Sequence, residues 1–175
     1  MKSDTRAQQK GAAEMSDSMR LRRATTADAT LLAELAAKLF EDTFGPDNDP
    51  EDMREYLAGA FSEERQRAEL ADDSRHVWIA LDSLGRAIGY VTMCRDTRTN
   101  GVVAERPAEV QRIYADRAWH GRGLGRALMA ACVEQARAWN CDVLWLAVWE
   151  RNPRAIAFYE KLGYATVWHR MKHSL

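Results

Sequence analysis

Cysteine and proline are scarce in this 175-residue chain, and no long apolar run occurs in it. The three cysteines are an odd number, and none belongs to a CxxC pair. We therefore expect neither a disulfide framework nor a zinc site, and a reducing cytoplasm fits this cysteine use. No apolar run approaches the roughly 18 residues of a membrane span, and the N-terminus lacks the apolar segment of a secretory signal. We therefore expect a cytoplasmic protein that does not bind a membrane.

An excess of charge of either sign is also missing, because 25 Lys and Arg residues stand against 26 Asp and Glu residues. A net charge of −1 gives no global attraction to nucleic acid, and we find no DNA-binding motif. A chain of this length suits one domain whose core needs no disulfide or metal. Residues 1–18 are polar and aperiodic, so we expect a disordered leader there and a single domain over 19–175.

Hydrophobic periodicity predicts alternating strands and helices. The expected strands are 20–24, 77–81, 87–94, 108–115, 143–148 and 164–171. The expected helices run from the caps at 25–28 to about 44, from 51 to about 61, over about 62–71, over 124–139 and over 153–162. This order predicts an α/β fold, a mixed sheet with helices on both faces.

The segment from Trp119 to Leu128, with the sequence WHGRGLGRAL, follows a predicted strand and opens a predicted helix. Free N–H groups at a helix start attract anions, and glycines let the backbone approach a ligand closely. Arg122 and Arg126 can donate charge-assisted bonds to phosphate oxygens. The segment therefore predicts a site for a phosphate-bearing ligand, although a Gly-rich loop can also simply turn the chain.

Two nucleotide-binding motifs do not fit this loop. The dinucleotide fingerprint needs a glycine where Arg126 stands, and no P-loop pattern occurs. A dinucleotide-dependent oxidoreductase is therefore a disfavoured alternative, which calorimetry with NAD and acetyl-CoA would test.

A second segment is informative only in combination with the first. Asn152 is an expected N-cap, Pro153 the first helical residue and Gly163 the stop signal of one helix. Together the segments resemble the GNAT superfamily of acyl-CoA N-acyltransferases. The resemblance is carried by His120, Gly123 and Gly125 in the loop, and by Asn152, Ala155, Phe158, Tyr159, Lys161, Leu162 and Gly163 in the helix. His120 stands where Gln or Arg is usual, and Tyr164 where Phe is common.

The resemblance implies a largely antiparallel sheet with a splayed central strand pair, formed by about 108–115 and 143–148. The gap would admit the pantetheine arm of acetyl-CoA, the co-substrate, and no metal is implied. The implied cofactor-binding residues are Ile113, Tyr114, Ala115, His120, Gly121, Arg122, Gly123, Leu124, Gly125, Arg126, Asn152, Ala155 and Tyr159.

The resemblance also implies two catalytic residues. Tyr159 would protonate the departing CoA thiolate, unless it only packs against the cofactor. Glu109, 11 residues before His120, would be the general base, as in some branches of the family; the alternatives are a solvated carboxylate or a water as base. No cysteine matches the pattern, so we expect direct transfer in a ternary complex.

The acceptor is predicted from local charge together with the resemblance, because in this family the helices after the first strand usually border the acceptor site. This region is loosely similar to that of bacterial polyamine N-acetyltransferases. Residues 41–73 hold twelve acidic residues against three arginines, which favours a cationic acceptor such as a polyamine, although charged helices are usually just solvated faces. The alternatives are a catalytically idle acyl-CoA-binding module and an enzyme that acetylates protein N-termini or lysines. A homodimer is also open, with tryptophans as candidate contacts.

Overall fold

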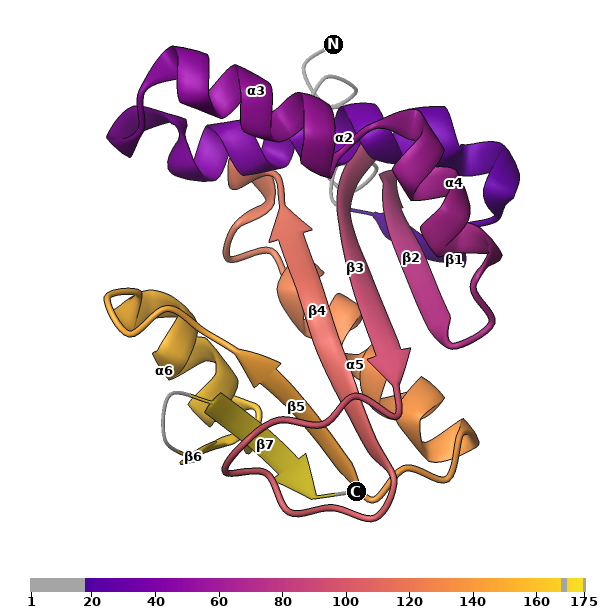
Figure 1. Ribbon diagram of the computed structural model, residues 1–175, viewed down its shortest axis with the longest axis vertical. Coiled ribbons are helices and arrows are strands. Elements are labelled where there is room, and N and C mark those ends of the chain that lie inside the picture. The colour runs from indigo at the N-terminus through magenta and orange to yellow at the C-terminus, as the bar shows by residue number, and fades with distance from the viewer. Residues whose placement is uncertain (1–17, 168–169, 175) are drawn as a thin grey trace, which may run out of the picture.

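The computed structural model describes residues 18–167 and 170–174 (Figure 1). Its strands are β1 (Met19–Arg23), β2 (Arg75–Asp82), β3 (Ala87–Arg95), β4 (Pro107–Ala115), β5 (Val143–Ala147), β6 (Ala165–Val167) and β7 (Arg170–Ser174). Its main helices are α2 (Ala29–Phe44), α3 (Pro50–Ala60), α4 (Glu63–Ala71), α5 (Leu124–Ala138) and α6 (Pro153–Lys161). The leader predicted over 1–18 lies outside the described residues except for its last one, so it stays a prediction.

The strands form one sheet in the order β1-β2-β3-β4-β5-β7-β6. Every neighbouring pair is antiparallel except β4 and β5, which are parallel. A parallel pair needs a crossover connection, and α5 provides it behind the sheet in Figure 1. The predicted mixed, largely antiparallel α/β sheet is confirmed.

The predicted last strand, 164–171, is wrong as a single element. The structure has a hairpin there, in which Val167 pairs with Arg170 and β7 joins the edge of β5. In a sequence, a two-residue hairpin turn is commonly indicated by Asn-Gly or a similar pair of residues. The sequence at this point is Trp168-His169, which carries no such signal and reads as a continuing strand.

Alternating residues of the strands build two separate cores, one on each face of the sheet. On one face, Val91, Met93 and Val110 pack with Leu128 and Cys132 of α5. The opposite face carries Val77, Ile79, Leu81 and Tyr90, which pack with Leu32, Leu35 and Leu39 of α2. The helices at the top of Figure 1 therefore cover one face of the sheet and α5 covers the other.

None of the helices in the part of the chain that the structure describes is long and apolar enough to cross a membrane. The tryptophans considered for a dimer contact divide: Trp119 and Trp145 are buried, whereas Trp149 is 60% exposed. Trp168 lies outside the described residues. The dimer contact therefore stays a prediction.

Candidate active site

The central feature of the site is the opening between β4 and β5. The two strands pair over four residues only, from Pro107 opposite Val143 to Val110 opposite Leu146. β5 then ends at Ala147, while β4 continues to Ala115. Beyond Val110 the edge of β4 has no β5 partner, so an extended ligand can add there as a strand would. The predicted splayed strand pair is confirmed.

A β-bulge lies at the point where the strands begin to separate. Thr92 of β3 pairs with Arg112, but the next β3 residue, Met93, pairs with Val110, so Gln111 is the extra residue of β4. Bulges are common next to active sites because they change the direction of side chains. No local sequence pattern predicts this bulge.

The predicted phosphate loop leads into α5 as expected. Gly121 and Gly123 have φ of +80° and +86°, and Gly123 is the N-cap of α5. No side chain of the described residues caps this helix start, and the first N–H groups of a helix have no partner within it. A Cβ built on Gly121 meets no atom within 4 Å, so the loop is open on that side. This geometry fits a diphosphate held by backbone N–H groups.

The side chains of the loop take different directions. The ring nitrogen Nε2 of His120 lies 3.1 Å from the carbonyl oxygen of Ala115, which ties the imidazole to the end of β4. The guanidinium of Arg122 lies over the Trp119 ring, 5.7 Å from its centroid. Arg126 is exposed. The two arginines are therefore at the surface beside the loop.

The second segment forms α6 as the local rules predict. The side chain of Asn152 accepts a hydrogen bond of 3.0 Å from the backbone N–H of Ala155, and Pro153 starts the helix. Gly163 follows the helix with φ of +87°. α6 also packs against the loop, because a Cβ on Gly125 would lie 3.1 Å from Cζ of Phe158. The two segments that carried the family resemblance therefore meet in space.

Tyr159 of α6 is buried among Phe158, Tyr164 and α5. Burial raises the pKa of its hydroxyl to about 12, with smaller contributions in the same direction from Cys132 and Tyr114. Ile113 and Ala115 in the far half of β4 pack against the same core cluster that contains Tyr159. The hydroxyl is therefore protonated at neutral pH, the state that a general acid requires.

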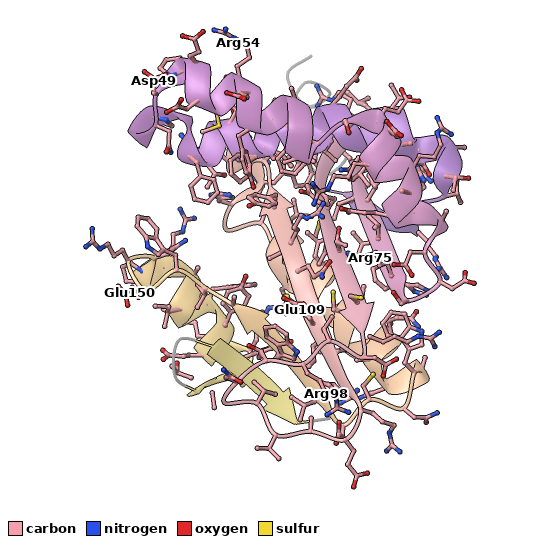
Figure 2. The ribbon with its side chains drawn as sticks, in the orientation of Figure 1. Asp49, Arg54, Arg75, Arg98, Glu109 and Glu150 are labelled. Carbon is pink, nitrogen blue, oxygen red and sulfur yellow. The ribbon has the colours of Figure 1, made fainter. Side chains whose placement is uncertain are left out.

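Glu109 lies on β4, half-buried, just before the bulge. Its register partners are Cys94 on β3 and Trp145 on β5. One carboxylate oxygen, Oε2, accepts a hydrogen bond of 3.4 Å from Nε2 of Gln111. Figure 2 shows Glu109 in front of the central strand, on the face opposite α5. Glu109 thus comes from β4, which borders the opening, and Tyr159 from α6, which follows β5 in the chain.

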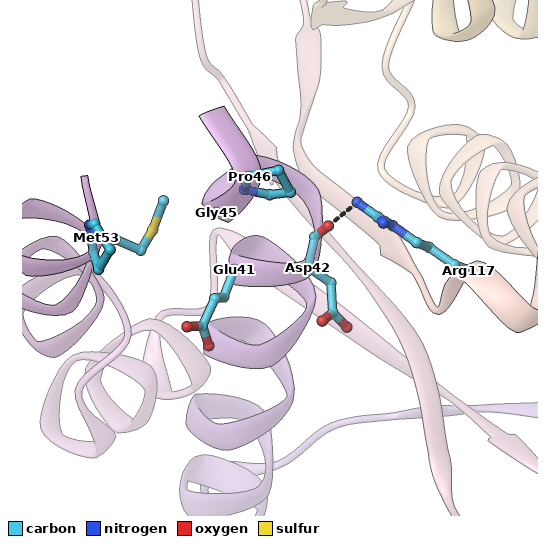
Figure 3. A pocket seen from close by; sticks show the side chains of 7 residues that line it. Glu41, Asp42, Gly45, Pro46, Met53 and Arg117 are labelled. Carbon is cyan, nitrogen blue, oxygen red and sulfur yellow. Dashed lines mark hydrogen bonds between the residues drawn. The ribbon is translucent and has the colours of Figure 1, made fainter. Parts of the chain in front are cut away.

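A pocket of about 340 Å³ lies where the end of α2 faces the start of α3 (Figure 3). Its lining residues are Glu41, Asp42, Gly45, Pro46, Pro50, Met53 and Arg117. The Arg117 guanidinium donates to the carbonyl oxygen of Asp42, as the dashed line in Figure 3 marks. The pocket thus combines two carboxylates with apolar side chains, and Arg117 connects it to the segment that leads into the glycine loop.

One partly buried ion pair was not anticipated from the sequence. Arg112 of β4 donates from Nη2 to both carboxylate oxygens of Glu69 on α4, at 2.7 and 2.8 Å. Glu69 and the nearby tyrosines raise the pKa of Arg112 in spite of its burial. The partners are 43 residues apart in the chain, so no local pattern marks them.

Comparison with known proteins gives the class. The model of the Acetyltransferase (GNAT) family matches residues 33–164. An uncharacterized N-acetyltransferase of Lactobacillus delbrueckii subsp. lactis is 36% identical over 129 residues, 74% of each chain. The N-alpha-acetyltransferase RimI of Mycobacterium tuberculosis is 33% identical over 151 residues, 85% of this chain and 80% of its own length.

A solved structure supports the same fold. The PaiA N-acetyltransferase of Thermoplasma acidophilum in complex with coenzyme A superimposes with a TM-score of 0.74 at 18% identity, covering 90% of this chain and 99% of the other. The chain belongs to the GNAT family of acetyltransferases. It is an acyl-CoA-dependent N-acetyltransferase, which transfers an acetyl group from acetyl-CoA to an amine.

Proposed function

We propose that the acceptor is a small cationic amine, such as a polyamine, and that it is acetylated by direct attack in a ternary complex. The observation that carries this proposal is the pocket with two carboxylates, Glu41 and Asp42, beside the segment that leads into the glycine loop. These two carboxylates outnumber the single guanidinium of the lining, that of Arg117, so the pocket favours an ammonium group over a neutral or anionic one.

Acetyl-CoA would bind along the edge that β5 leaves open. The loop from His120 through Gly121, Arg122, Gly123, Leu124 and Gly125 to Arg126 would hold the diphosphate. The edge of β4 at Ile113, Tyr114 and Ala115 would pair with the pantetheine arm, flanked by Asn152 and Ala155 at the start of α6. The open glycine loop, the uncapped helix start and the unpaired β4 edge support this arrangement. We expect the enzyme to need no metal.

The chemistry follows from the charges that develop during the reaction. An alkylammonium has a pKa of about 10 and must lose a proton before its nitrogen attacks the thioester carbonyl. Glu109 would take that proton. When the C–S bond breaks, the thiolate leaves with a proton from Tyr159, whose burial keeps its hydroxyl protonated. Backbone N–H groups at the strand edge can stabilise the oxyanion.

The choice of amine has support from one relative as well as from the pocket. The spermine/spermidine N(1)-acetyltransferase of Bacillus subtilis is 29% identical over 56 residues, which is 31% of this chain. The likeness covers less than a third of the chain, so the weight of the argument falls on the pocket and its charge.

The test compares two carboxylates of similar exposure. Glu41 lines the pocket, and Glu64 is exposed on α4 and does not line it. We expect Glu41→Gln to raise KM for spermidine about two- to fivefold, as for one screened charge pair, with KM for acetyl-CoA unchanged. Glu64→Gln is the matched control and should change neither. Equal effects of both variants, or a kcat/KM for spermidine no higher than for a neutral amino acid ester, would contradict the cationic acceptor.

A second candidate acceptor is a protein N-terminus. It is favoured by the 33% identity to the N-alpha-acetyltransferase RimI over 85% of this chain. A set of peptides with free N-termini, assayed beside spermidine and a lysine peptide, separates the acceptor classes. Binding of CoA without turnover on any amine would favour the idle acyl-CoA-binding module instead.

A further inference from the structure

A chain of hydrogen bonds leads from the turn after α4 to Glu109. Nε of Arg75 donates to Oδ2 of Asp72 at 3.1 Å, and Nη1 of Arg75 donates to Oε1 of Gln111. Nε2 of Gln111 then donates to Oε2 of Glu109 at 3.4 Å. Figure 2 labels Arg75 and Glu109, which come from β2 and β4, the strands on either side of β3.

The chemistry of these groups fixes the direction of the middle amide. A guanidinium can only donate, and an ionised carboxylate can only accept. If the Gln111 amide turned over, its NH₂ would face Arg75 and its oxygen would face Glu109, and both contacts would be repulsive. Arg75 therefore holds the amide so that its donor points at Glu109.

The β-bulge makes this contact possible. Val110 and Ile113 both belong to the core on the α5 side. The two residues between them, Gln111 and Arg112, bond to Arg75 and to Glu69 respectively. In a regular strand consecutive side chains point to opposite faces. The extra residue lets both side chains engage the segment formed by α4 and the start of β2.

We propose that Gln111 and Arg75 are positioning residues that keep the Glu109 carboxylate ionised and fixed in one orientation while it takes the proton of the acceptor amine. This inference rests on the proposed role of Glu109 as general base. A hydrogen bond donated to the charged form of an acid favours that form. The glutamine amide achieves this without itself carrying a charge that would repel an ammonium acceptor.

A test of this role should remove the bond from Gln111 without changing the other charged groups around Glu109. The titratable or charged groups on neighbouring elements are Arg75 on β2, Cys94 on β3, Arg112 on β4 and Glu69 on α4, and Lys172 holds the β7 register position beside Trp145. Arg112 and Glu69 compensate each other, and Asp72 partly compensates Arg75. Substitution at Gln111 leaves all of these in place.

The test is the acid limb of the pH dependence of kcat/KM for the amine. Gln111→Met keeps the side-chain length and removes the donor, so we expect the limb to move to higher pH by about half a unit to one unit. Gln111→Glu can still pair with Arg75 but adds a like charge, and should move the limb further. Gln135→Met, on α5 across the sheet, is the matched control and should leave the limb unchanged. Thermal unfolding checks that each variant is folded.

The outcomes separate the inference from the function on which it rests. Glu109→Gln should abolish the acid limb. If it does so, and Gln111→Met leaves the limb of folded enzyme in place, the positioning role is overturned and Glu109 remains the base. If Glu109→Gln itself leaves the limb unchanged, the base is another group, and both proposals on this face of β4 are overturned.

Discussion

Replacement of Tyr159 by phenylalanine separates stability from catalysis. The hydroxyl makes no hydrogen bond to another side chain or backbone group that the structure describes, and the ring is packed in the core under α6. Tyr159→Phe keeps that packing and removes no partner's bond, so the free energy of unfolding should change by less than about 1 kcal/mol. The loss of a general acid, by contrast, costs about 10²- to 10⁴-fold in rate.

The assay is release of free CoA thiol, followed under saturating acetyl-CoA, together with urea unfolding of the same preparations. We expect kcat to fall at least about 100-fold with KM for acetyl-CoA nearly unchanged. Because burial raises the pKa of Tyr159 to about 12, its own ionisation should not limit the wild-type rate at pH 7 to 9. A variant with normal kcat would show that Tyr159 only packs against the cofactor, and a variant that is strongly destabilised would show that the hydroxyl has a structural role.

Three further predictions concern the glycine loop and the stability of the protein at acid pH. Gly123→Ala forces a non-glycine residue to φ of +86° and should cost about 1 to 3 kcal/mol while weakening CoA binding measured by calorimetry. Burial lowers the pKa of His76 to about 4. Because the unfolded chain is protonated at higher pH than the folded one, the free energy of unfolding should fall as the pH drops from about 6.5 towards 4. His76→Phe should remove this pH dependence, as measured by urea titrations. Hydrogen bonds from Arg22 lower the pKa of Asp28 to about 2. The stabilisation that the Asp28 carboxylate gives the folded state is therefore full above pH 4 and lost towards pH 2. Asp28→Asn should lower the free energy of unfolding by about 1 kcal/mol at pH 7 and give a flatter acid denaturation curve.

Elements with strong local signals could be predicted from the sequence. The segment of α6 carries signals for both of its ends: an N-cap followed by a proline at the start, and a glycine after the last turn. In the structure these residues begin and end the helix as predicted. The long amphipathic repeat of α5 and the apolar run of β5 were equally clear. In these segments one choice of structure satisfies both the local backbone and the burial of apolar side chains.

The features that were missed depend on pairing rather than on local sequence. β6 pairs with β7 as a hairpin, but the sequence between them, Trp168-His169, favours an extended strand over a tight turn. The bulge at Gln111 is decided by how β4 pairs with β3. The bonds Arg112–Glu69 and Arg75–Gln111 join residues 43 and 36 positions apart, and a charged residue in a sequence does not reveal its partner.

Helix caps and ion pairs, local as well as long-range, also reduce the free negative charge of the acidic surplus in residues 41–73. Asp49 caps α3 with its carboxylate, Glu63 pairs with Arg67 at 2.6 Å, Glu69 is bound by Arg112 and Asp72 by Arg75. A carboxylate that is already engaged attracts an ammonium ligand less than a free one does. Composition alone therefore overstates the attraction of this region for a cation.

The carboxylates at the pocket are a better basis for the acceptor than the count of twelve. Asp42 is partly neutralised by Lys38, 2.7 Å away, whereas Glu41 has no ion-pair partner among the residues that the structure describes. If the acceptor is a polyamine, its second ammonium group should therefore depend on Glu41 more than on Asp42. A single-charge amine of similar length should then lose the sensitivity to Glu41→Gln that spermidine has, because only the longer-range attraction is left to it. An identical response of both amines would mean that the pocket does not receive the acceptor, whatever its charge.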